Sequence, residues 1–385
     1  MKKTSGKTMK IAMYGHKRIP SREGGIEVVV EELCARMVQR GCEVTCYNRR
    51  GHHVAGSEFD QDAGDVYRGI RLKSVPTVNR RGLAAFSSSF FAAIACAFGR
   101  YDVVHVHAEG PAIFCWIPKL AGKKVVCTIH GLDYARAKWG RIASALLLQG
   151  EKCAVRFADD IIVLNPAHRK YFARRYGRRT VCIPNGVERP KRLETDRIRK
   201  KWGLEKDGYI LFVGRIVPEK GLRYLIRAYR RVRTGKKLVI AGGTSDSGDF
   251  PQKLKKMAEG DDRILFTGFV EGQELGELYS NAYLYVLPSD LEGMPLTLLE
   301  AMSYGRCCLV SDIPECTEVT EDHAMIFRKS DENDLAGKLQ YACDHAEETA
   351  RYSREAADYI CRKYSWEDVT EKTLRVYRSK KGFQI

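Results

Sequence analysis

Two carboxylates, Glu292 and Glu300, lie in a segment whose composition is typical of a ligand-binding loop that runs into a helix. The segment covers residues 288–302 and follows a β-rich run at 282–287. Glu292 is expected just before the helix and Glu300 about one and a half turns inside it, roughly 7 to 12 Å apart at the rise of an α-helix. The two carboxylates are therefore expected to do different jobs. For an isolated pair, a helix cap and a solvated glutamate would be the plainer interpretation.

The turn between these carboxylates has the features of an anion-binding site. Pro295 suits the first position of a helix, because a proline there loses no intrahelical hydrogen bond. The turn at Gly293 and Met294 is then expected to leave backbone N–H groups that point at the helix N-terminus, where phosphate groups bind. The segment therefore predicts a phosphate site.

Two cations, Arg215 and Lys220, stand in a second segment, which begins at Gly214 and ends at Gly221 after a β-rich run at 209–213. An arginine binds phosphate oxygens through two parallel hydrogen bonds, and a lysine supplies a compact point charge. Taken alone, two surface cations in a basic protein would be an adequate interpretation. Their place at a strand-to-helix turn, where doubly wound folds bind ligands, favours a diphosphate site.

The elements that must position these residues alternate between strand and helix along the chain. The β-rich runs lie at 11–14, 43–47, 70–75, 102–106, 124–129, 160–164 and 180–183, and then at 209–213, 237–241, 263–266, 282–287, 307–310 and 324–327. Between the first two runs, apolar residues recur at helical spacing from Ile26 to Met37 until Gly41 ends the pattern. The alternation predicts an α/β protein with two doubly wound, Rossmann-like sheets.

A change of composition predicts the domain boundary. Residues 188–206 are charged and contain proline, which is typical of a linker. We therefore expect a first Rossmann-like domain at 1–187 and a second at 188–365, with one further helix at 366–378. In such a pair of sheets, ligands bind at the carboxyl ends of the strands.

The charge of the chain is unevenly distributed. Of 385 residues, 44% are hydrophobic and 29% charged, which excludes a disordered, fibrous or membrane-embedded class. The formal net charge is +17, yet residues 1–190 carry 32 Lys and Arg against 16 Asp and Glu, whereas residues 191–385 carry 33 against 32. This asymmetry indicates an anionic partner for the first half, either nucleic acid or an acidic membrane leaflet.

The remaining global features indicate a cytoplasmic protein. The 13 cysteines include no Cys-x-x-Cys pair, so reduced thiols are expected. The first ten residues are basic and polar, unlike a secretory signal. The longest nearly apolar run, residues 83–98, is too short to span a bilayer. It is expected to form a buried helix, or else a helix that lies in a membrane interface beside Arg80 and Arg81.

Taken together, the motifs resemble those of the retaining nucleotide-sugar glycosyltransferases of family four, whose GT-B fold has two Rossmann-like domains facing across a cleft. Five motifs occur in the family's order along nearly the whole chain: Gly24-Gly25, Thr-x-His-Gly at 128–131, Pro-Asn-Gly-Val at 184–187, Gly-Arg-x4-Lys-Gly at 214–221 and Glu-x7-Glu at 292–300. The loop at 18–27 is similar to that of bacterial capsule and cell-wall rhamnosyl- and glucosyltransferases. It departs from them at Glu23, where an aromatic residue is common.

The resemblance implies a reaction and its catalytic residues. Glu300 would hold the ribose hydroxyls of the donor, Arg215 and Lys220 would neutralise its diphosphate, and Glu292 and His130 would lie beside its sugar. A sugar would pass from a nucleoside diphosphate to an acceptor hydroxyl with retention, while the leaving phosphate helps to take the acceptor proton. No cofactor and no metal are expected, because the two cations stabilise the leaving group.

Main-chain groups would complete the donor site. The resemblance implies that backbone contacts to the sugar and phosphates come from Gly293, Met294, Pro295 and Leu296, and that those to the base come from Phe269 and Val270. Gly24 and Gly25 would approach the phosphate from the first domain, since a residue without a side chain permits a close backbone approach. The last helix, residues 366–385, would return to the first domain.

Two further features have competing interpretations. His105 and His107 share one face of a strand and could suggest a metal pair, but no third ligand stands nearby. Lining the cleft or satisfying buried polar groups is the favoured role. The six cations at 169–179 form either a solvated helix face or a membrane-facing patch.

Two other functions are weighed against a glycosyltransferase. An NAD-dependent Rossmann oxidoreductase would need Gly-x-Gly-x-x-Gly in the first turn, where this chain has Gly15-His-Lys-Arg-Ile-Pro20. A non-catalytic basic adaptor for membrane or nucleic acid would not need the site motifs, and aromatic-basic signatures of RNA binding are absent.

The favoured function is a hexosyltransferase that acts in bacterial surface polysaccharide or glycolipid assembly. Its expected partners are a nucleoside-diphosphate sugar and a glycan or lipid-linked acceptor, but no nucleic acid. The enzyme is expected in the cytoplasm, attached peripherally to the anionic inner face of the cell membrane through its basic first domain.

Overall fold

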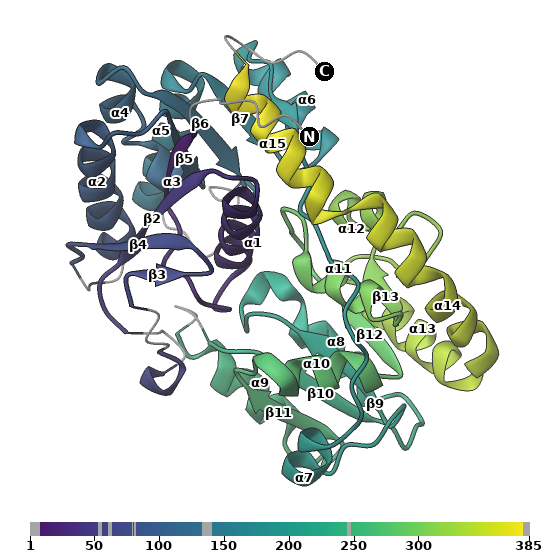
Figure 1. Cartoon of the computed structure of the whole chain (residues 1–385). Helices are drawn as coiled ribbons and strands as arrows, with labels where there is room; N and C mark the ends of the chain where they lie inside the picture. The colour runs from purple at the N-terminus through teal and green to yellow at the C-terminus, as the bar shows by residue number, and fades with distance from the viewer. Residues whose placement is uncertain are drawn as a thin grey trace, which may run out of the picture. The chain divides into compact units, whose positions relative to one another are not determined.

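The computed structural model describes residues 8–52, 56–60, 64–78, 80, 82–132, 141–244 and 248–379, with the side chains of 141–143 left out. Arg81, residues 1–7 and residues 380–385, on which some of the expectations above fall, lie outside the described residues. The chain divides into two compact units (Figure 1). Unit 1 consists of Met1–Asn185 together with Trp366–Ile385, and unit 2 consists of Gly186–Ser365. The sequence places the boundary at residue 187, two residues further along.

Unit 1 is built on a sheet whose described part has eight strands. In spatial order they are β3 (Val66–Tyr67), β4 (Ile70–Val75), β2 (Glu43–Arg49), β1 (Lys10–Tyr14), β5 (Val103–His107), β6 (Lys124–Ile129), β7 (Asp160–Val163) and β8 (Val181–Cys182). All neighbouring strands are parallel except β3, which is antiparallel to β4 and was not predicted. The strand order reverses between β1 and β5, and open α/β sheets bind ligands at such a point.

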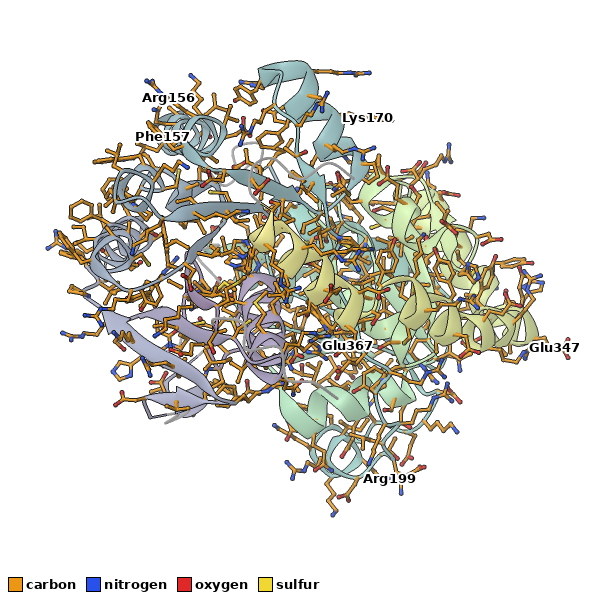
Figure 2. All side chains as sticks on the ribbon, turned by 45° about the horizontal axis from the view of Figure 1, so that its top comes forward. Arg156, Phe157, Lys170, Arg199, Glu347 and Glu367 are labelled. Carbon is orange, nitrogen blue, oxygen red and sulfur yellow. The ribbon has the colours of Figure 1, made fainter. Side chains whose placement is uncertain are left out.

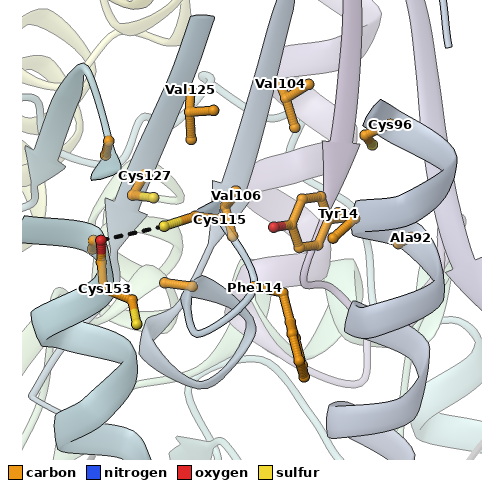
Figure 3. Packing of buried hydrophobic residues seen from close by; sticks show 14 of the residues in the cluster. Tyr14, Ala92, Cys96, Val104, Val106, Phe114, Cys115, Val125, Cys127 and Cys153 are labelled. Carbon is orange, nitrogen blue, oxygen red and sulfur yellow. Dashed lines mark hydrogen bonds between the residues drawn. The ribbon is translucent and has the colours of Figure 1, made fainter. Parts of the chain in front are cut away.

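Helices cover both faces of this sheet. They are α1 (Gly25–Gln39), α2 (Leu83–Phe98), α3 (Glu109–Ala112), α4 (Trp116–Leu120), α5 (Arg141–Phe157), α6 (Pro166–Tyr176) and α15 (Trp366–Arg378). Side chains of α2, α5 and α6 share one apolar core with strand residues such as Val104 and Val106 (Figure 3). His105, which alternates with those valines, points to the opposite face and hydrogen bonds to Tyr377 of α15.

Helix α2 has the predicted bounds but only part of the predicted burial. Ala92 and Cys96 are buried and lie beside Tyr14 of β1 (Figure 3), whereas Phe90 and Phe91 are exposed. The expectation of a buried helix is therefore wrong for the side of α2 that carries these phenylalanines. Among the described residues, no helix is both long enough and apolar enough to cross a bilayer.

Unit 2 has a six-stranded sheet in its described part, and all of its strands are parallel. In spatial order they are β11 (Ile264–Gly268), β10 (Lys237–Ala241), β9 (Tyr209–Val213), β12 (Leu284–Leu287), β13 (Cys307–Ser311) and β14 (Met325–Phe327). This order, with the reversal between β9 and β12, is that of a dinucleotide-binding Rossmann sheet. The predicted pair of doubly wound Rossmann-like units is confirmed.

The helices of unit 2 connect these strands. They are α7 (Arg197–Trp202), α8 (Leu222–Tyr229), α9 (Phe250–Ala258), α10 (Gly272–Asn281), α11 (Leu296–Ser303), α12 (Pro314–Thr320), α13 (Glu332–Asp344) and α14 (Ala346–Lys363). Helix α7 lies inside the stretch that the sequence analysis treats as a linker. It is held by Glu277, whose carboxylate accepts hydrogen bonds from the backbone N–H groups of Asp196, Arg197 and Ile198. None of the thirteen cysteines, all of which lie within the described residues, forms a disulfide bond.

Candidate functional site

The candidate site of unit 2 lies at the reversal point of its sheet, where the loops after β9 and β12 meet. The two loops approach closely: a Cβ atom on Gly221 would lie 1.8 Å from the carbonyl oxygen of Pro288. The backbone N–H of Asp290 donates to the carbonyl oxygen of Glu219 at 2.8 Å. Gly221 also has a φ of +68°, a conformation that glycine adopts at little cost. A glycine at this position therefore lets the two sequence-predicted segments come together.

Lys220 and Glu292, one from each loop, form an ion pair. The Nζ–Oε1 distance is 2.5 Å, and the two side chains are only 12% and 10% exposed. The Ser289 hydroxyl donates a second hydrogen bond to the same carboxylate oxygen at 2.6 Å. The structure thus brings together a predicted phosphate-binding cation and a predicted sugar-binding carboxylate, a pairing that the sequence analysis did not include.

Arg215 lies in the same loop as Lys220 but is not paired. The residue is half-buried, and its guanidinium makes no ion pair or hydrogen bond to any residue in the part of the chain that the structure describes. The backbone around it is fixed, because the N–H of Ile216 donates to the carbonyl oxygen of Gly243 at 3.0 Å. A cation held in a rigid loop without an anionic partner is suited to binding an anionic ligand.

Glu300 is the fifth of the eight residues of α11 and contacts a different set of residues. The hydroxyl of Tyr279 donates to its Oε2 atom at 3.0 Å, and the Tyr279 ring stacks on Tyr304 with centroids 5.4 Å apart. Burial raises the pKa of Tyr279 well above its ordinary value, and the charge of Glu300 raises it further. Tyr279 therefore remains a hydrogen-bond donor and orients Glu300. The two glutamates thus contact different sets of residues, and their different jobs stay a prediction.

Helix α11 begins one residue later than predicted. Leu296 is its first residue and Pro295 occupies the N-cap, so the placement of proline at the first helical position is wrong. The N–H groups of Leu298 and Leu299 donate to the carbonyl oxygen of Pro295, and no side chain caps the helix. Gly293, Met294 and Pro295 are buried in the turn, and Leu296 is half-buried.

Phe269 and Val270 follow β11 at the same carboxyl edge of the sheet. Val270 is buried and Phe269 is half-buried. The preceding Gly268 has a φ of +74°, and its carbonyl oxygen accepts a hydrogen bond of 2.8 Å from the N–H of Gly242. The Phe269 ring lies beside Gly243, on which a Cβ atom would be 3.4 Å from it. The turn predicted to frame the base is thus joined to the loop after β10.

In unit 1, the loop after β1 lies against the end of β5. A Cβ atom on Gly15 would be 2.2 Å from the carbonyl oxygen of His107. Gly24 is the N-cap of α1 and Gly25 its first residue, so the Gly-Gly pair lies at a helix N-terminus. Glu27 accepts a hydrogen bond of 2.8 Å from the Lys17 backbone N–H. Burial alone would raise the pKa of Glu27, but the Lys17 charge and hydrogen bonds hold it below its ordinary value.

His130 follows β6 and is linked to His107 of β5. Their Nε2 and Nδ1 atoms are 3.0 Å apart, so one ring donates to the other. His107 is fully buried, and burial lowers its pKa well below the ordinary value, an effect that His105, His130 and His16 reinforce. The neutral His107 therefore fixes the orientation of the half-buried His130.

The structure gives His105 a clear role that involves no metal. Its two ring nitrogens contact Tyr377 and Thr128 through hydrogen bonds of 2.6 Å each. Burial, with a small contribution from His130, lowers its pKa to about 3. Within the described ranges, no three His, Cys, Asp or Glu side chains are arranged to hold a metal ion. His105 is a buried polar group whose hydrogen bonds are satisfied.

Ser289 and Tyr279 also position the candidate site, and neither was predicted from the sequence. Ser289 stands three residues before Glu292, and a hydroxyl so close to a loop carboxylate is a local signal that could have been used. Tyr279 lies on α10, 21 residues before Glu300, and its contact depends on how two helices pack. No local pattern in the sequence indicates that contact.

The comparisons with known proteins all find glycosyltransferases. A family model described as "Glycosyltransferase Family 4" matches residues 23–189, and one described as "Glycosyl transferases group 1" matches residues 194–359. An uncharacterised glycosyltransferase of Methanocaldococcus jannaschii is 31% identical over an alignment that covers 48% of each chain. A D-inositol 3-phosphate glycosyltransferase of Acidothermus cellulolyticus is 26% identical over 92% of this chain and 85% of its own.

A solved structure shares the fold. The Anabaena protein HepE, crystallised with UDP and glucose, superposes with a TM-score of 0.78 at 15% identity, covering 96% of this chain and 99% of its own. At this level of identity the likeness shows the fold alone. It confirms the predicted GT-B fold.

Proposed function

The chain belongs to the glycosyltransferases with the GT-B fold, and we propose that it transfers a sugar from a nucleoside-diphosphate sugar to an acceptor hydroxyl with retention of configuration. The observation that carries this proposal is the arrangement at the reversal point of unit 2. Two loops meet there. The loop after β9 carries Arg215 and Lys220, and the loop after β12 carries Glu292 and leads into the N-terminus of α11.

The diphosphate of the donor is assigned to the loop after β9 and the start of α11. Arg215 provides a guanidinium that no described residue engages, and Lys220 is held at the loop by Glu292. The α11 N-terminus adds a helix dipole and has no side-chain cap. These groups would neutralise the charge that develops on the leaving nucleoside diphosphate, which is why no metal and no cofactor are proposed.

The nucleoside is assigned to Glu300 and the turn at Phe269 and Val270. Glu300 accepts a hydrogen bond from Tyr279, and an ionised carboxylate offers about four acceptor positions, a chemistry suited to ribose hydroxyls. The turn offers main-chain groups to the base at the same edge of the sheet. Uridine is the first base to test, because the Anabaena neighbour is a complex with UDP and glucose.

The sugar is assigned to Glu292 and the backbone of residues 293–296. Glu292 is already engaged by Lys220 and Ser289, so we assign it to positioning the sugar. The acceptor hydroxyl would lose its proton to the leaving phosphate oxygen as the new glycosidic bond forms and the old bond breaks. This front-face course accounts for retention without a covalent enzyme intermediate.

The acceptor is proposed to be a glycan or a lipid-linked sugar in bacterial surface polysaccharide or glycolipid assembly. The support is the likeness of the loop at 18–27 to that group of transferases. The two rival functions are not favoured, because family models of glycosyltransferases match both units and the first turn lacks the dinucleotide fingerprint.

A donor screen tests the proposal. The purified chain is titrated with UDP-, dTDP- and GDP-sugars while thermal shift and slow hydrolysis of each donor are recorded. We expect one base to raise the melting temperature, and Arg215→Ala to abolish that shift while Arg223→Ala, an exposed cation on α8, preserves it. A chain that binds no nucleotide sugar, or that binds NAD instead, would contradict the proposal.

A further inference from the structure

Helix α2 presents its large apolar side chains to the outside and its small ones to the core. The sixteen residues Leu83–Phe98 include no charged side chain. The buried positions are Ser88, Ser89, Ala92, Ala93 and Cys96. The exposed positions include Leu83, Phe86, Phe90, Phe91 and Phe98, the last of which is 88% exposed. A helix of a globular protein normally has the opposite arrangement, with its large apolar residues against the sheet.

The exposed apolar surface continues onto the neighbouring helices. Trp116 and Leu120 of α4 and Leu146 of α5 are exposed, and Phe114 packs between the α2 rings of Phe86 and Phe90 at centroid distances of 4.7 and 5.4 Å. We call the exposed apolar residues of α2, α4 and α5 the phenylalanine face. Of the large hydrophobic side chains that are exposed within the described residues, only Ile326 and Tyr341 belong to unit 2.

The helical layer that carries this face presents positive charge. Helices α5 and α6, which share the core under the same side of the sheet, expose Lys152, Arg156, Arg169, Lys170, Arg174 and Arg175. Figure 2 marks Arg156 and Lys170 on the outer side of these helices.

Negative charge is missing from the exposed surface of the same layer. Between residues 82 and 179, no acidic side chain in the described part of the chain is exposed. Glu109, Glu151 and Asp160 are buried. Asp102 and Asp159 are half-buried and accept hydrogen bonds from the backbone N–H groups of Lys10 and Val125. The surface is thus apolar and cationic without compensating acids.

A groove of about 850 Å³ adjoins the phenylalanine face, between α2 and strands β2 and β4. Phe91 and Phe98 line one side of it, and Arg71, Lys73 and Arg100 contribute cations. These three cations are exposed and form no ion pair with any described residue. The groove therefore combines apolar and cationic contacts within reach of one amphiphilic molecule.

We propose that the phenylalanine face of unit 1 docks on an anionic lipid bilayer, with α2 lying in the plane of the interface. The apolar side chains would enter the boundary between headgroups and acyl chains, and the surrounding cations would contact lipid phosphates. A second copy of the chain is the less favoured occupant, because two such faces would bring like-charged surfaces together. The proposal concerns where unit 1 binds and holds whether or not the proposed reaction is correct.

Vesicle binding tests the proposal on the full chain in the absence of any donor. Co-sedimentation is measured with phosphatidylcholine vesicles, with mixed phosphatidylglycerol–phosphatidylcholine vesicles, and at low and high salt. We expect binding to the anionic vesicles that weakens with salt, since the attraction of the cations is screened beyond ~8 Å at physiological ionic strength. The double variant Phe91→Ser/Phe98→Ser should lower the partition coefficient by about tenfold or more, and Lys152→Gln/Arg156→Gln should remove much of the salt dependence.

Matched variants in unit 2 provide the controls. Ile326→Ser/Tyr341→Ser and Lys255→Gln/Lys256→Gln alter exposed residues of the same types and should leave vesicle binding unchanged. Circular dichroism of each variant shows whether it folds. In a Trp116→Phe background, the fluorescence added by Phe98→Trp should be quenched by brominated acyl chains, whereas the fluorescence added by Tyr341→Trp should not.

Several results would overturn the proposal. One is that the wild type does not bind anionic vesicles at low salt. Another is that the wild type and the α2 double variant bind them equally. A third is that the wild type forms a dimer, which the α2 double variant does not form, and does not bind vesicles. The last result would assign the face to a second copy.

Discussion

Lys220 and Glu292, 72 residues apart in the chain, form an ion pair across the two loops at the reversal point of the unit 2 sheet. The pair is nearly enclosed, and Ser289 holds the carboxylate from its other side. The charges of Lys220 and Glu292 offset each other. Arg215, the other cation of these two loops, forms no ion pair with any described residue. An incoming diphosphate would therefore meet Arg215 as its main electrostatic partner.

Replacing Arg215 should affect turnover far more than it affects the fold. We expect Arg215→Ala to lower kcat on the order of 10² to 10³, the cost of removing one preorganised charge stabiliser. Arg223→Ala, an exposed cation eight residues further along, should leave kcat unchanged. Steady-state kinetics with the donor found in the screen provide the measurement. Equal kinetics for the two variants would remove Arg215 from the diphosphate site.

Glu300 should determine donor affinity. Glu300→Ala removes charge-assisted hydrogen bonds to ribose that are worth roughly 1.5 to 3 kcal/mol each, and calorimetric titration should show that loss. Tyr279→Phe removes only the hydroxyl that orients Glu300 at 3.0 Å, so we expect a smaller loss with the same enthalpic sign. If Glu300→Ala binds the donor as the wild type does, the ribose is held elsewhere.

Turnover should not depend on a divalent metal. Arg215 and the start of α11 would supply most of the positive potential that a metal would otherwise provide at the leaving group, because Glu292 offsets much of the Lys220 charge. Rates measured with EDTA and with added Mg²⁺ or Mn²⁺ should therefore agree within error. Loss of activity in EDTA that is restored by either ion would refute this prediction.

Buried histidines should make the protein less stable as the pH falls from 6.5. Burial lowers the pKa of His16 to about 4, the Glu27 charge opposes that shift, and the Nε2–H of His16 donates a hydrogen bond to Oδ1 of Asn48. The unfolded chain then binds more protons between pH 6.5 and 4, so this contribution to stability is complete above pH 6.5 and is lost below it. At pH 5 the loss amounts to about 2 kcal/mol for this one group.

Urea unfolding at pH 7.5 and pH 5 measures that loss. His16→Gln should lower the stability at pH 7.5 but flatten the pH dependence by about the stated amount. Burial also lowers the pKa of His105, to about 3. His105 therefore adds the same pH dependence to the unfolding free energy of both proteins, and this contribution cancels in the comparison. Identical pH dependence in the two proteins would show that His16 does not titrate in this way.

Substituting alanine for Gly221 tests how closely this residue approaches Pro288, because it adds a single methyl group at the contact. Gly221→Ala places a Cβ atom 1.8 Å from a carbonyl oxygen, whereas Gly260→Ala, at a similar φ of +79°, meets no atom within 4 Å. Both variants bear the strain of a positive φ, about 1 kcal/mol or more, so their difference isolates the contact. We expect Gly221→Ala to be the less stable protein and to bind donor poorly. Equal melting temperatures would contradict the observed geometry.

The fold was largely predictable because its signals are local. Residues such as Ile210 and Val239 stand in short apolar runs that are long enough for a buried parallel strand, and each run became a strand within about two residues of its predicted bounds. The antiparallel β3 was missed because Val66–Tyr67 is too short to produce a pattern. Helix α7 was missed because its charged residues resemble those of a linker.

The candidate site was predictable as two segments but not as a set of contacts. Arg215 and Glu300 were identified from their motifs, and those motifs lie at the carboxyl edge of the sheet. The partners Ser289 and Tyr279 and the pairing of Lys220 with Glu292 depend on how loops and helices pack, which no spacing rule gives. The outward phenylalanines of α2 were also misjudged, because hydrophobicity alone does not indicate whether an apolar face meets the core or a partner.

The return of α15 to unit 1 has a consequence for biosynthesis. Tyr377 hydrogen bonds to His105 in the sheet, and Lys124 donates to the carbonyl oxygen of Ser379. These residues are translated only after every residue of unit 2, so the ribosome releases the unit 2 sequence as a continuous stretch before unit 1 can close. During that interval the sheet face around His105 lacks its covering helix. Unit 1 can therefore cover this face of its sheet only after residues 366–379 have left the ribosome.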